Sequence, residues 1–194
     1  MGIFCAAFAV SDRTIETLLQ DPLLVWQVVE HEDYDTYLQA VQEANRQPIF
    51  RRLLGKVPPP VRPRRLDFTG HELKALDLDK SWDGLDRTLR TLWRDQPSFF
   101  ESGREIGKLE VGLGPALFHS SAAMGAFALT IGTVSEQQFL SAFERTDLSQ
   151  AYLDRFWERR DNDVVEYITE HFSALQEFVR HAAAHSLGAV MQFG

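Results

Sequence analysis

The chain has 194 residues, a formal net charge of −8, 44% hydrophobic residues and 25% charged residues. This length and composition are typical of one globular domain and exclude a disordered protein. The negative charge argues against a nucleic-acid binder, because neutralising phosphates requires an excess of Lys and Arg. The single cysteine, Cys5, cannot form an internal disulfide, and its apolar neighbours favour a packed thiol in a reducing compartment.

The N-terminal segment lacks the pattern of an export signal, because no positive residue precedes its apolar run and Asp12 follows too soon. The apolar run 122–131 is shorter than the roughly 18 residues that a membrane span requires. We therefore expect a cytoplasmic protein that does not contact a membrane.

The first predicted element is a strand over 3–10, an uninterrupted apolar run that indicates burial on both faces. Ser11 is expected to cap a helix that continues to about Leu19. A second helix is predicted to open at Asp21–Pro22, because proline is favoured in the first turn. A third helix is predicted over Tyr34–Asn45.

The segment 44–66 differs from its surroundings, because it holds seven Lys and Arg residues and no acidic residue. Subtracting these seven charges from the total of −8 leaves −15 for the remainder. Four prolines predict an extended loop at about 55–66, and its string PVRPRR matches a P-x-x-P-x-R pattern that docks in aromatic grooves. The candidate basic patch consists of Arg51, Arg52, Arg62, Arg64 and Arg65. It is either a solvated connector or a site for an acidic partner or a phosphorylated ligand.

A helix is predicted over 75–93, where apolar residues recur with the spacing of one helix face. These residues are Leu78, Trp82, Leu85, Leu89 and Leu92. Acidic residues near its start satisfy free backbone N–H groups, so capping explains them without catalysis. We expect Trp82 to anchor the core.

The rest of the chain alternates helices with short strands and turns. The predicted order is a loop at 94–107, strands at 108–111 and 116–119, helices at 121–131, 135–145, 148–157 and 161–187, and a strand at 189–193. Ser135 and Gln138 have capping-box spacing. Because both chain ends are predicted core strands, we expect one α+β domain over 1–194, with a small mixed β-sheet packed against several α-helices.

No strong metal or catalytic motif is present. His181 and His185 follow Glu177 along the last predicted helix, but the H-E-x-x-H arrangement is missing and the helix plot favours a solvated face. The sequence also lacks a phosphate loop, a nucleophile elbow and a C-x-x-C pair. We expect no metal and no cofactor, while a catalytic constellation assembled from distant residues stays open.

Candidate site residues are those that a cleft near the strand ends would collect. They are Asp79, Trp82, His119, Trp157, Asp161, Tyr167 and His171. The histidines are suited to proton transfer near neutral pH. The competing interpretation is structural: Asp79 and Asp161 cap helices, and the histidines and indoles pack in the core.

Several segments, taken in order, resemble the YfbM-like bacterial proteins, a family of unknown function. The segments are LDLDKSW at 76–82, VGLGPALF at 111–118, RFWERRDNDVVEYITEHFSALQEFV at 155–179 and the opening MGIFCAAFAVSD. The resemblance implies an α+β fold with helices on a small mixed sheet, and it implies no activity. Leu113 and Leu117 stand where the family pattern favours an aromatic residue and an arginine.

Two classes of function are expected from these observations. The absence of a catalytic motif and the acidic remainder favour a non-enzymatic protein-binding module, of the inhibitor or immunity type, with a basic protein partner. The alternative is a small-molecule-binding domain or enzyme whose cleft lies near the strand ends. A third possibility is regulation through the basic segment by an acidic partner.

Overall fold

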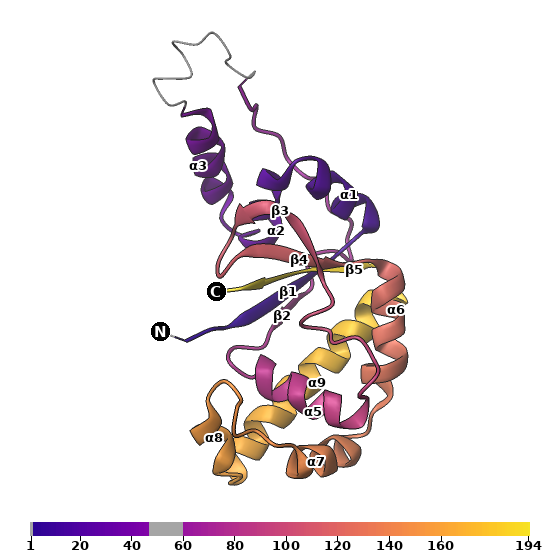
Figure 1. The fold of residues 1–194 in the computed structure, drawn as a ribbon. Coiled ribbons are helices and arrows are strands. Elements are labelled where there is room, and N and C mark those ends of the chain that lie inside the picture. The colour runs from indigo at the N-terminus through magenta and orange to yellow at the C-terminus, as the bar shows by residue number, and fades with distance from the viewer. Residues whose placement is uncertain (1, 47–59) are drawn as a thin grey trace.

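The computed structural model describes residues 2–46 and 60–194 and places five strands in one sheet, in the order β2-β1-β5-β4-β3 (Figure 1). Their bounds are β1 Cys5–Val10, β2 Ala75–Asp77, β3 Arg104–Glu110, β4 Pro115–His119 and β5 Gly188–Phe193. The α+β class and the use of both chain ends as strands are confirmed. Every pair in this sheet is antiparallel, which corrects the expected mixed pairing. A short turn joins β3 to β4, and such a connection permits only antiparallel pairing.

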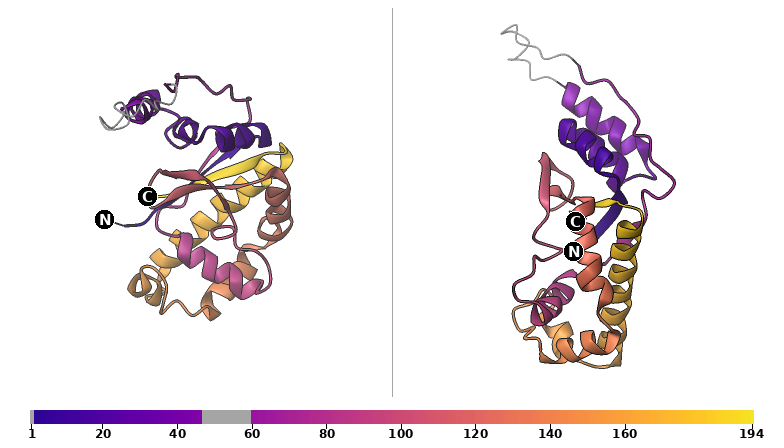
Figure 2. Two further views of the ribbon diagram at one scale, coloured as in Figure 1. Left: turned by 45° about the horizontal axis from the view of Figure 1, so that its top comes forward. Right: turned by 90° about the vertical axis from the view of Figure 1, so that its right-hand side faces the viewer.

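Helices cover both faces of the sheet (Figures 1 and 2). On one face lie α1 Asp12–Gln20, the 3-10 turn η1 Pro22–Val25, α2 Trp26–Val29 and α3 Tyr34–Asn45. On the other face lie α5 Trp82–Leu92, α6 Ser121–Thr130, η2 Ile131–Thr133, α7 Glu136–Arg145, α8 Asp154–Glu158 and α9 Asn162–Ala184. Successive residues of β1 therefore enter two different cores: Ala7 and Ala9 face α9, whereas Phe8 and Val10 face α1–α3.

The helix α9 forms the centre of the larger core. Asp161 caps its first turn by accepting a hydrogen bond from the Val164 amide at 3.1 Å. Its buried stripe includes Ile168 and Phe172, and the Phe172 ring stacks on Phe139 of α7 at 3.9 Å. The helix ends at Ala184, three residues before the predicted end, because the chain must turn into β5.

The expected helix over 75–93 is wrong in its first part. Residues Ala75–Asp77 form the edge strand β2, with Leu76 opposite Ala7 of β1, and the helix starts at Trp82. Pairing with β1 satisfies the backbone groups that a helix would have used. The buried Leu78 therefore belongs to the turn before α5, although it has the spacing of the helix face.

Two other predicted boundaries change. The predicted helix 148–157 is reduced to Asp154–Glu158, because Leu153 adopts a left-handed conformation with φ of 64°. The predicted loop 94–107 contains the first half of β3, which carries a register shift between Glu105 and Glu110. Gly107 lies in that shift with φ of +66°, and a Cβ there would approach Pro22 to 2.7 Å.

No helix in residues 2–46 and 60–194 combines the length and the apolar character that crossing a membrane requires. The first part of the predicted basic loop, together with Arg51 and Arg52, lies outside the described residues.

Candidate functional site

Three of the predicted cleft residues form one polar cluster between the β2–α5 turn and α9. The Tyr167 hydroxyl donates a hydrogen bond to the Asp79 carboxylate at 2.9 Å and accepts one from the Lys80 amide at 3.2 Å. The His171 Nδ1 lies 2.7 Å from the Tyr167 carbonyl oxygen. Burial and the neighbouring Asp79 carboxylate raise the pKa of Tyr167, so its hydroxyl stays protonated. The cluster ties the turn to the helix.

The two predicted indoles anchor other segments. Trp82 donates from Nε1 to the Ile3 carbonyl oxygen at 3.1 Å, and its ring meets Phe193 edge-on at 5.1 Å. Trp157 is fully buried, and its Nε1 donates to the Tyr152 carbonyl oxygen at 2.6 Å. Each indole therefore satisfies its N–H within the chain, as large buried indoles usually do.

His119 and Asp161 occupy separate environments. His119 is only 3% exposed, and its Nε2 lies 2.7 Å from the carbonyl oxygen of Phe99, whose ring stacks against the imidazole. Burial lowers the pKa of His119 and favours the neutral imidazole. Asp161 is exposed, caps α9 and pairs with Arg159 at 2.7 Å. The contacts of the seven predicted residues thus divide them among several places in the fold.

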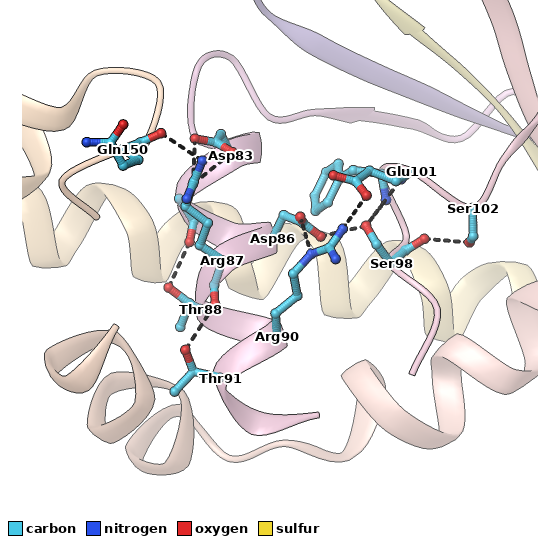
Figure 3. Close-up of polar contacts among 12 residues, drawn as sticks. Asp83, Asp86, Arg87, Thr88, Arg90, Thr91, Ser98, Glu101, Ser102 and Gln150 are labelled. Carbon is cyan, nitrogen blue, oxygen red and sulfur yellow. Dashed lines mark hydrogen bonds and ion pairs between the residues drawn. The ribbon is translucent and has the colours of Figure 1, made fainter. Parts of the chain in front are cut away.

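A polar network on α5, not expected from the sequence as a site, contains a buried carboxylate (Figure 3). Asp86 accepts hydrogen bonds from Ser98 Oγ at 2.5 Å and Arg90 Nε at 2.7 Å, and Arg90 also pairs with Glu101 at 2.5 Å. Burial raises the pKa of Asp86, although both hydrogen bonds act in the opposite direction. The adjoining cavity measures only about 20 Å³, which is the space of about one water molecule.

The second ion pair of α5 in Figure 3 has a similar structural role. Arg87 pairs with Asp83 at 3.0 Å and donates to the Gln150 carbonyl oxygen at 2.7 Å. Asp83 also accepts a hydrogen bond from the Tyr152 amide at 2.6 Å. The i,i+4 spacing of Asp83–Arg87 and Asp86–Arg90 is the sequence signal that predicts such pairs. Both networks hold loops against α5.

The described part of the basic segment packs against Gln27 of α2 and against Tyr34 and Tyr37 of α3. The Arg64 amide donates to the Tyr37 hydroxyl at 3.1 Å, and the Arg64 carbonyl oxygen accepts from Gln27 Nε2 at 2.8 Å. The Leu66 amide donates to the other end of the Gln27 amide group at 3.0 Å. The Arg65 guanidinium stacks over the Tyr34 ring at 4.3 Å. The proline-containing string thus docks within the chain, and its backbone is fixed.

A pocket of about 390 Å³ lies between this segment and α1. Its lining includes the guanidinium-bearing residues Arg13, Arg64 and Arg65. Four hydroxyl-bearing residues and two acidic ones complete the polar lining: Ser11, Thr14, Thr17, Thr69, Asp67 and Glu72. This volume lies within the usual range of ligand sites.

We call this site the arginine pocket. The Glu72 carboxylate clamps together the segments that line it. One of its carboxylate oxygens accepts from the Ser11 amide and the Thr14 hydroxyl, each at 2.7 Å, and the other accepts from the Thr69 amide at 2.7 Å. Partial burial alone would raise the pKa of Glu72, but these hydrogen bonds outweigh it and lower the pKa. With Glu72 engaged in this way, Asp67 and the three arginines are the other charged residues of the lining.

Two members of the predicted basic patch therefore reach the pocket. Arg64 also pairs with Asp21 at 3.5 Å, and its side chain remains half exposed. Arg62 is exposed but does not line the pocket. Sequence reasoning missed Arg13, because no local signal connects a residue of α1 with a segment fifty positions later.

A smaller apolar pocket lies near the strand ends, where the sequence predicts a cleft. It measures about 300 Å³ and includes Trp82 of the predicted residues. Its other lining residues are Ile3, Phe100, Glu101, Leu113 and Phe193. In residues 2–46 and 60–194, no group of three or more His, Cys, Asp or Glu side chains is placed to hold a metal ion.

The crystal structure of YfbM from Escherichia coli, a protein of unknown function, is similar to this chain with a TM-score of 0.47 and 13% sequence identity. That similarity covers 97% of this chain and 98% of the other. No curated protein matches. The family model described as "Domain of unknown function (DUF1877)" matches residues 1–192. The chain therefore belongs to the DUF1877 family.

Proposed function

We propose that this protein is a non-enzymatic binding module that recognises an acidic segment of a protein partner through the arginine pocket. The observation that carries this proposal is the convergence of Arg13, Arg64 and Arg65 around one cavity of about 390 Å³. Guanidinium groups bind carboxylates and phosphates with paired, charge-assisted hydrogen bonds. The neighbouring hydroxyl groups supply further donors of the kind that such anions accept.

The fixed backbone of residues 61–66 supports the proposal. Gln27 holds the segment on both sides of Arg65, and Tyr37 holds the amide of Arg64. A site that is ordered before binding loses less conformational entropy when the ligand arrives. Binding would still immobilise the arginine side chains, but the backbone of Arg64 and Arg65 is already held in place.

The charge distribution gives the site its selectivity. The chain carries −8 overall, so most of its surface repels an acidic ligand. A region rich in arginine attracts such a ligand, and the attraction weakens as salt screens it over about 8–10 Å. The sequence alone favoured a basic partner for the acidic surface, whereas the arginine pocket favours the third possibility, an acidic partner. An inhibitor or immunity protein is one form that this module could take.

The proposal of a non-enzymatic module is supported by the hydrogen bonds of the two polar clusters, which engage their carboxylate and hydroxyl groups within the fold. The Asp86 carboxylate is occupied by Ser98 and Arg90, and the Tyr167 hydroxyl is occupied by Asp79 and Lys80. In each cluster the hydrogen bonds connect two segments of the fold.

The test uses a fluorescein-labelled hexa-aspartate peptide as the probe, with a hexa-lysine peptide as its control. Binding to the full chain is measured by fluorescence anisotropy at 50 mM and 500 mM salt, and its location by amide chemical-shift changes in NMR. We expect hexa-aspartate to shift amides at 11–17 and 64–72, with binding that weakens at high salt. Shifts confined to other regions, or stronger binding of hexa-lysine, would overturn the proposal.

Two variants locate the binding energy. Hydrogen bonds to charged groups contribute about 1.5–3 kcal/mol, so Arg13→Gln with Arg65→Gln should weaken hexa-aspartate binding by about tenfold or more. The matched control is Arg62→Gln, which removes an exposed charge from the same segment but outside the pocket lining. The control should change binding by less than about threefold, the size of a screened surface effect. Equal losses in the two variants would show nonspecific attraction to the basic segment.

A second candidate function is binding of a small aromatic molecule in the apolar pocket near the strand ends. The observation that favours it is the lining by Trp82, Phe100 and Phe193, since aromatic rings pack well against one another. Indole is a suitable probe, because about 300 Å³ accommodates it. We expect indole to shift the amides of residues 3, 82, 113 and 193, and Leu113→Asp to abolish those shifts. Indole shifts spread over the whole chain would count against this function.

A further inference from the structure

Three histidines meet on the surface next to the arginine pocket. The His71 ring stacks on His185 with centroids 3.8 Å apart and an interplanar angle of 10°, and His185 also contacts the His181 ring at 4.7 Å. The His181 Nε2 lies 3.0 Å from the His71 carbonyl oxygen and can only donate to it. His71 lies on the turn before β2, whereas the other two lie at the C-terminal end of α9. The contact therefore joins segments about 110 positions apart in the chain.

Near-parallel stacking of His71 on His185 is disfavoured when both rings are charged. If both rings were protonated, two positive charges would lie about 4 Å apart and would repel each other. The hydrogen bond from His181 to the His71 carbonyl survives protonation, because both ring nitrogens of a charged imidazole carry a proton. Repulsion therefore acts on the ring contacts at the His71 side of the turn, while Glu72 is held separately by Ser11 and Thr14.

The charged groups around the cluster offset this repulsion only in part. Glu177 lies one turn before His181 on α9, and its ion pair with Lys74 and its attraction to a charged His181 both lower the pKa of its carboxyl group. Arg180 on the same helix is directed to the Gly132 carbonyl oxygen and adds positive charge. On the turn, the Glu72 carboxylate is directed to Ser11 and Thr14. On α1, Asp12 is engaged by Ser121. The carbonyl groups at the end of α9 also favour a charged ring, through the helix dipole.

The turn that carries His71 also forms a wall of the arginine pocket. Thr69 and Glu72 flank His71 in sequence and line the pocket, and the Thr69 amide donates to the Glu72 carboxylate. Beyond the turn, Leu73 and Lys74 hydrogen-bond to Ala9 of β1 and so remain attached to the sheet. Movement of His71 would therefore displace the tip 69–71 without detaching β2, while Glu72 stays bound to Ser11 and Thr14.

We propose that His71, His181 and His185 form a pH-sensitive clasp, which holds the tip of the turn beside the arginine pocket at neutral pH and loosens it when the histidines protonate. The clasp itself stands on the ring geometry, while its effect on ligand binding rests on the function proposed above. Solvent exclusion and the two neighbouring histidines lower the pKa of His185, in the direction that the stacked arrangement requires. Because this pKa is lowered, the closed form is favoured at neutral pH and loses stability as the pH falls below the ordinary range of histidine.

The test measures amide hydrogen exchange of the full chain at pH 7.5 and pH 5.5, corrected for the intrinsic exchange rate at each pH. We expect protection of amides 69–72 to fall by roughly fivefold or more at pH 5.5, while the buried centre of α9 keeps its protection. His71→Gln combined with His185→Gln should make exchange of 69–72 independent of pH. The matched control, His31→Gln, removes a histidine that packs on Phe8, away from the clasp, and should leave the pH dependence unchanged.

Unchanged protection of 69–72 between the two pH values would overturn the clasp, as would the same pH dependence in the double variant. Hexa-aspartate binding measured at both pH values separates the two proposals, because the peptide stays ionised at pH 5.5. Weaker binding at pH 5.5 in the wild-type chain but not in the double variant is the result expected if both hold. A pH-dependent turn with pH-independent binding supports the clasp and contradicts the role of this wall in the pocket.

Discussion

Replacing Gly84 by alanine tests whether the packing of α5 on Trp157 or the intrinsic preference of the helix decides stability. A Cβ at position 84 would lie 2.8, 2.9 and 3.1 Å from three atoms of the Trp157 indole. The indole has little freedom to withdraw, because it is fully buried, bound through Nε1 to Tyr152 and packed edge-on against Phe143 and Phe156. Overpacking of this kind costs about 1–3 kcal/mol.

The opposing effect is the helix propensity of alanine, which exceeds that of glycine by about 1 kcal/mol. The difference predicts that Gly84→Ala lowers the free energy of unfolding by up to about 2 kcal/mol, or the melting temperature by up to about 8 °C for a chain of this size. Gly125→Ala in α6 is the matched control, because a Cβ there has no neighbour within 4 Å. It should stabilise the protein by about 0.5–1 kcal/mol.

Urea unfolding followed by far-UV circular dichroism measures both free energies, and an unchanged m value would confirm that the same transition is compared. Combining Gly84→Ala with Trp157→Phe should give a loss smaller than the sum of the two single losses, because the smaller ring makes room for the methyl group. Stabilisation by Gly84→Ala equal to that by Gly125→Ala would refute the reasoning.

Three further changes have expected outcomes. Ser98→Ala removes a donor to the buried Asp86 and should cost about 1–3 kcal/mol in urea unfolding, whereas a neutral result would show that the network holds nothing together. The lowered pKa of His119 means that the unfolded chain takes up a proton before the folded one does, so stability should fall with pH below about 6.5. His119→Gln should weaken this dependence in melting curves between pH 7.5 and 5.5, and an unaltered slope would assign it to other groups. Ser135→Ala removes the capping box of α7 and should cost about 1 kcal/mol, against a negligible effect of the exposed Ser173→Ala.

Local signals predicted the elements that depend on neighbouring residues. The helix Tyr34–Asn45 has the predicted bounds, and the capping box at Ser135 is formed by the predicted partner Gln138. The start of α9 at Asp161 follows from the same chemistry, since a side chain satisfies amides two or three residues ahead. These interactions span a few residues, so their spacing is visible in the sequence.

The candidate site was predicted less well, because its residues meet across long sequence separations. Asp79 and Tyr167 do come together, but His119 is enclosed by Phe99 and Phe127 instead. A strand-end histidine has the same sequence pattern in either environment. The packing of α6 on the sheet determines which residues surround His119, and this packing cannot be predicted from the spacing of nearby residues.

The sequence by itself determined the class of the fold, most helix starts and the resemblance to a family, because caps, apolar periodicity and charge patterns act over one or two turns of chain. Tertiary structure alone decided that Ala75–Asp77 pairs with β1 as a strand, because the free backbone of the sheet edge outweighs helical spacing. It also brought Arg13 to Arg65 and His71 to His185. Such contacts are fixed only when the whole chain buries its apolar surface, and they are the ones on which the proposed binding and its pH dependence rest.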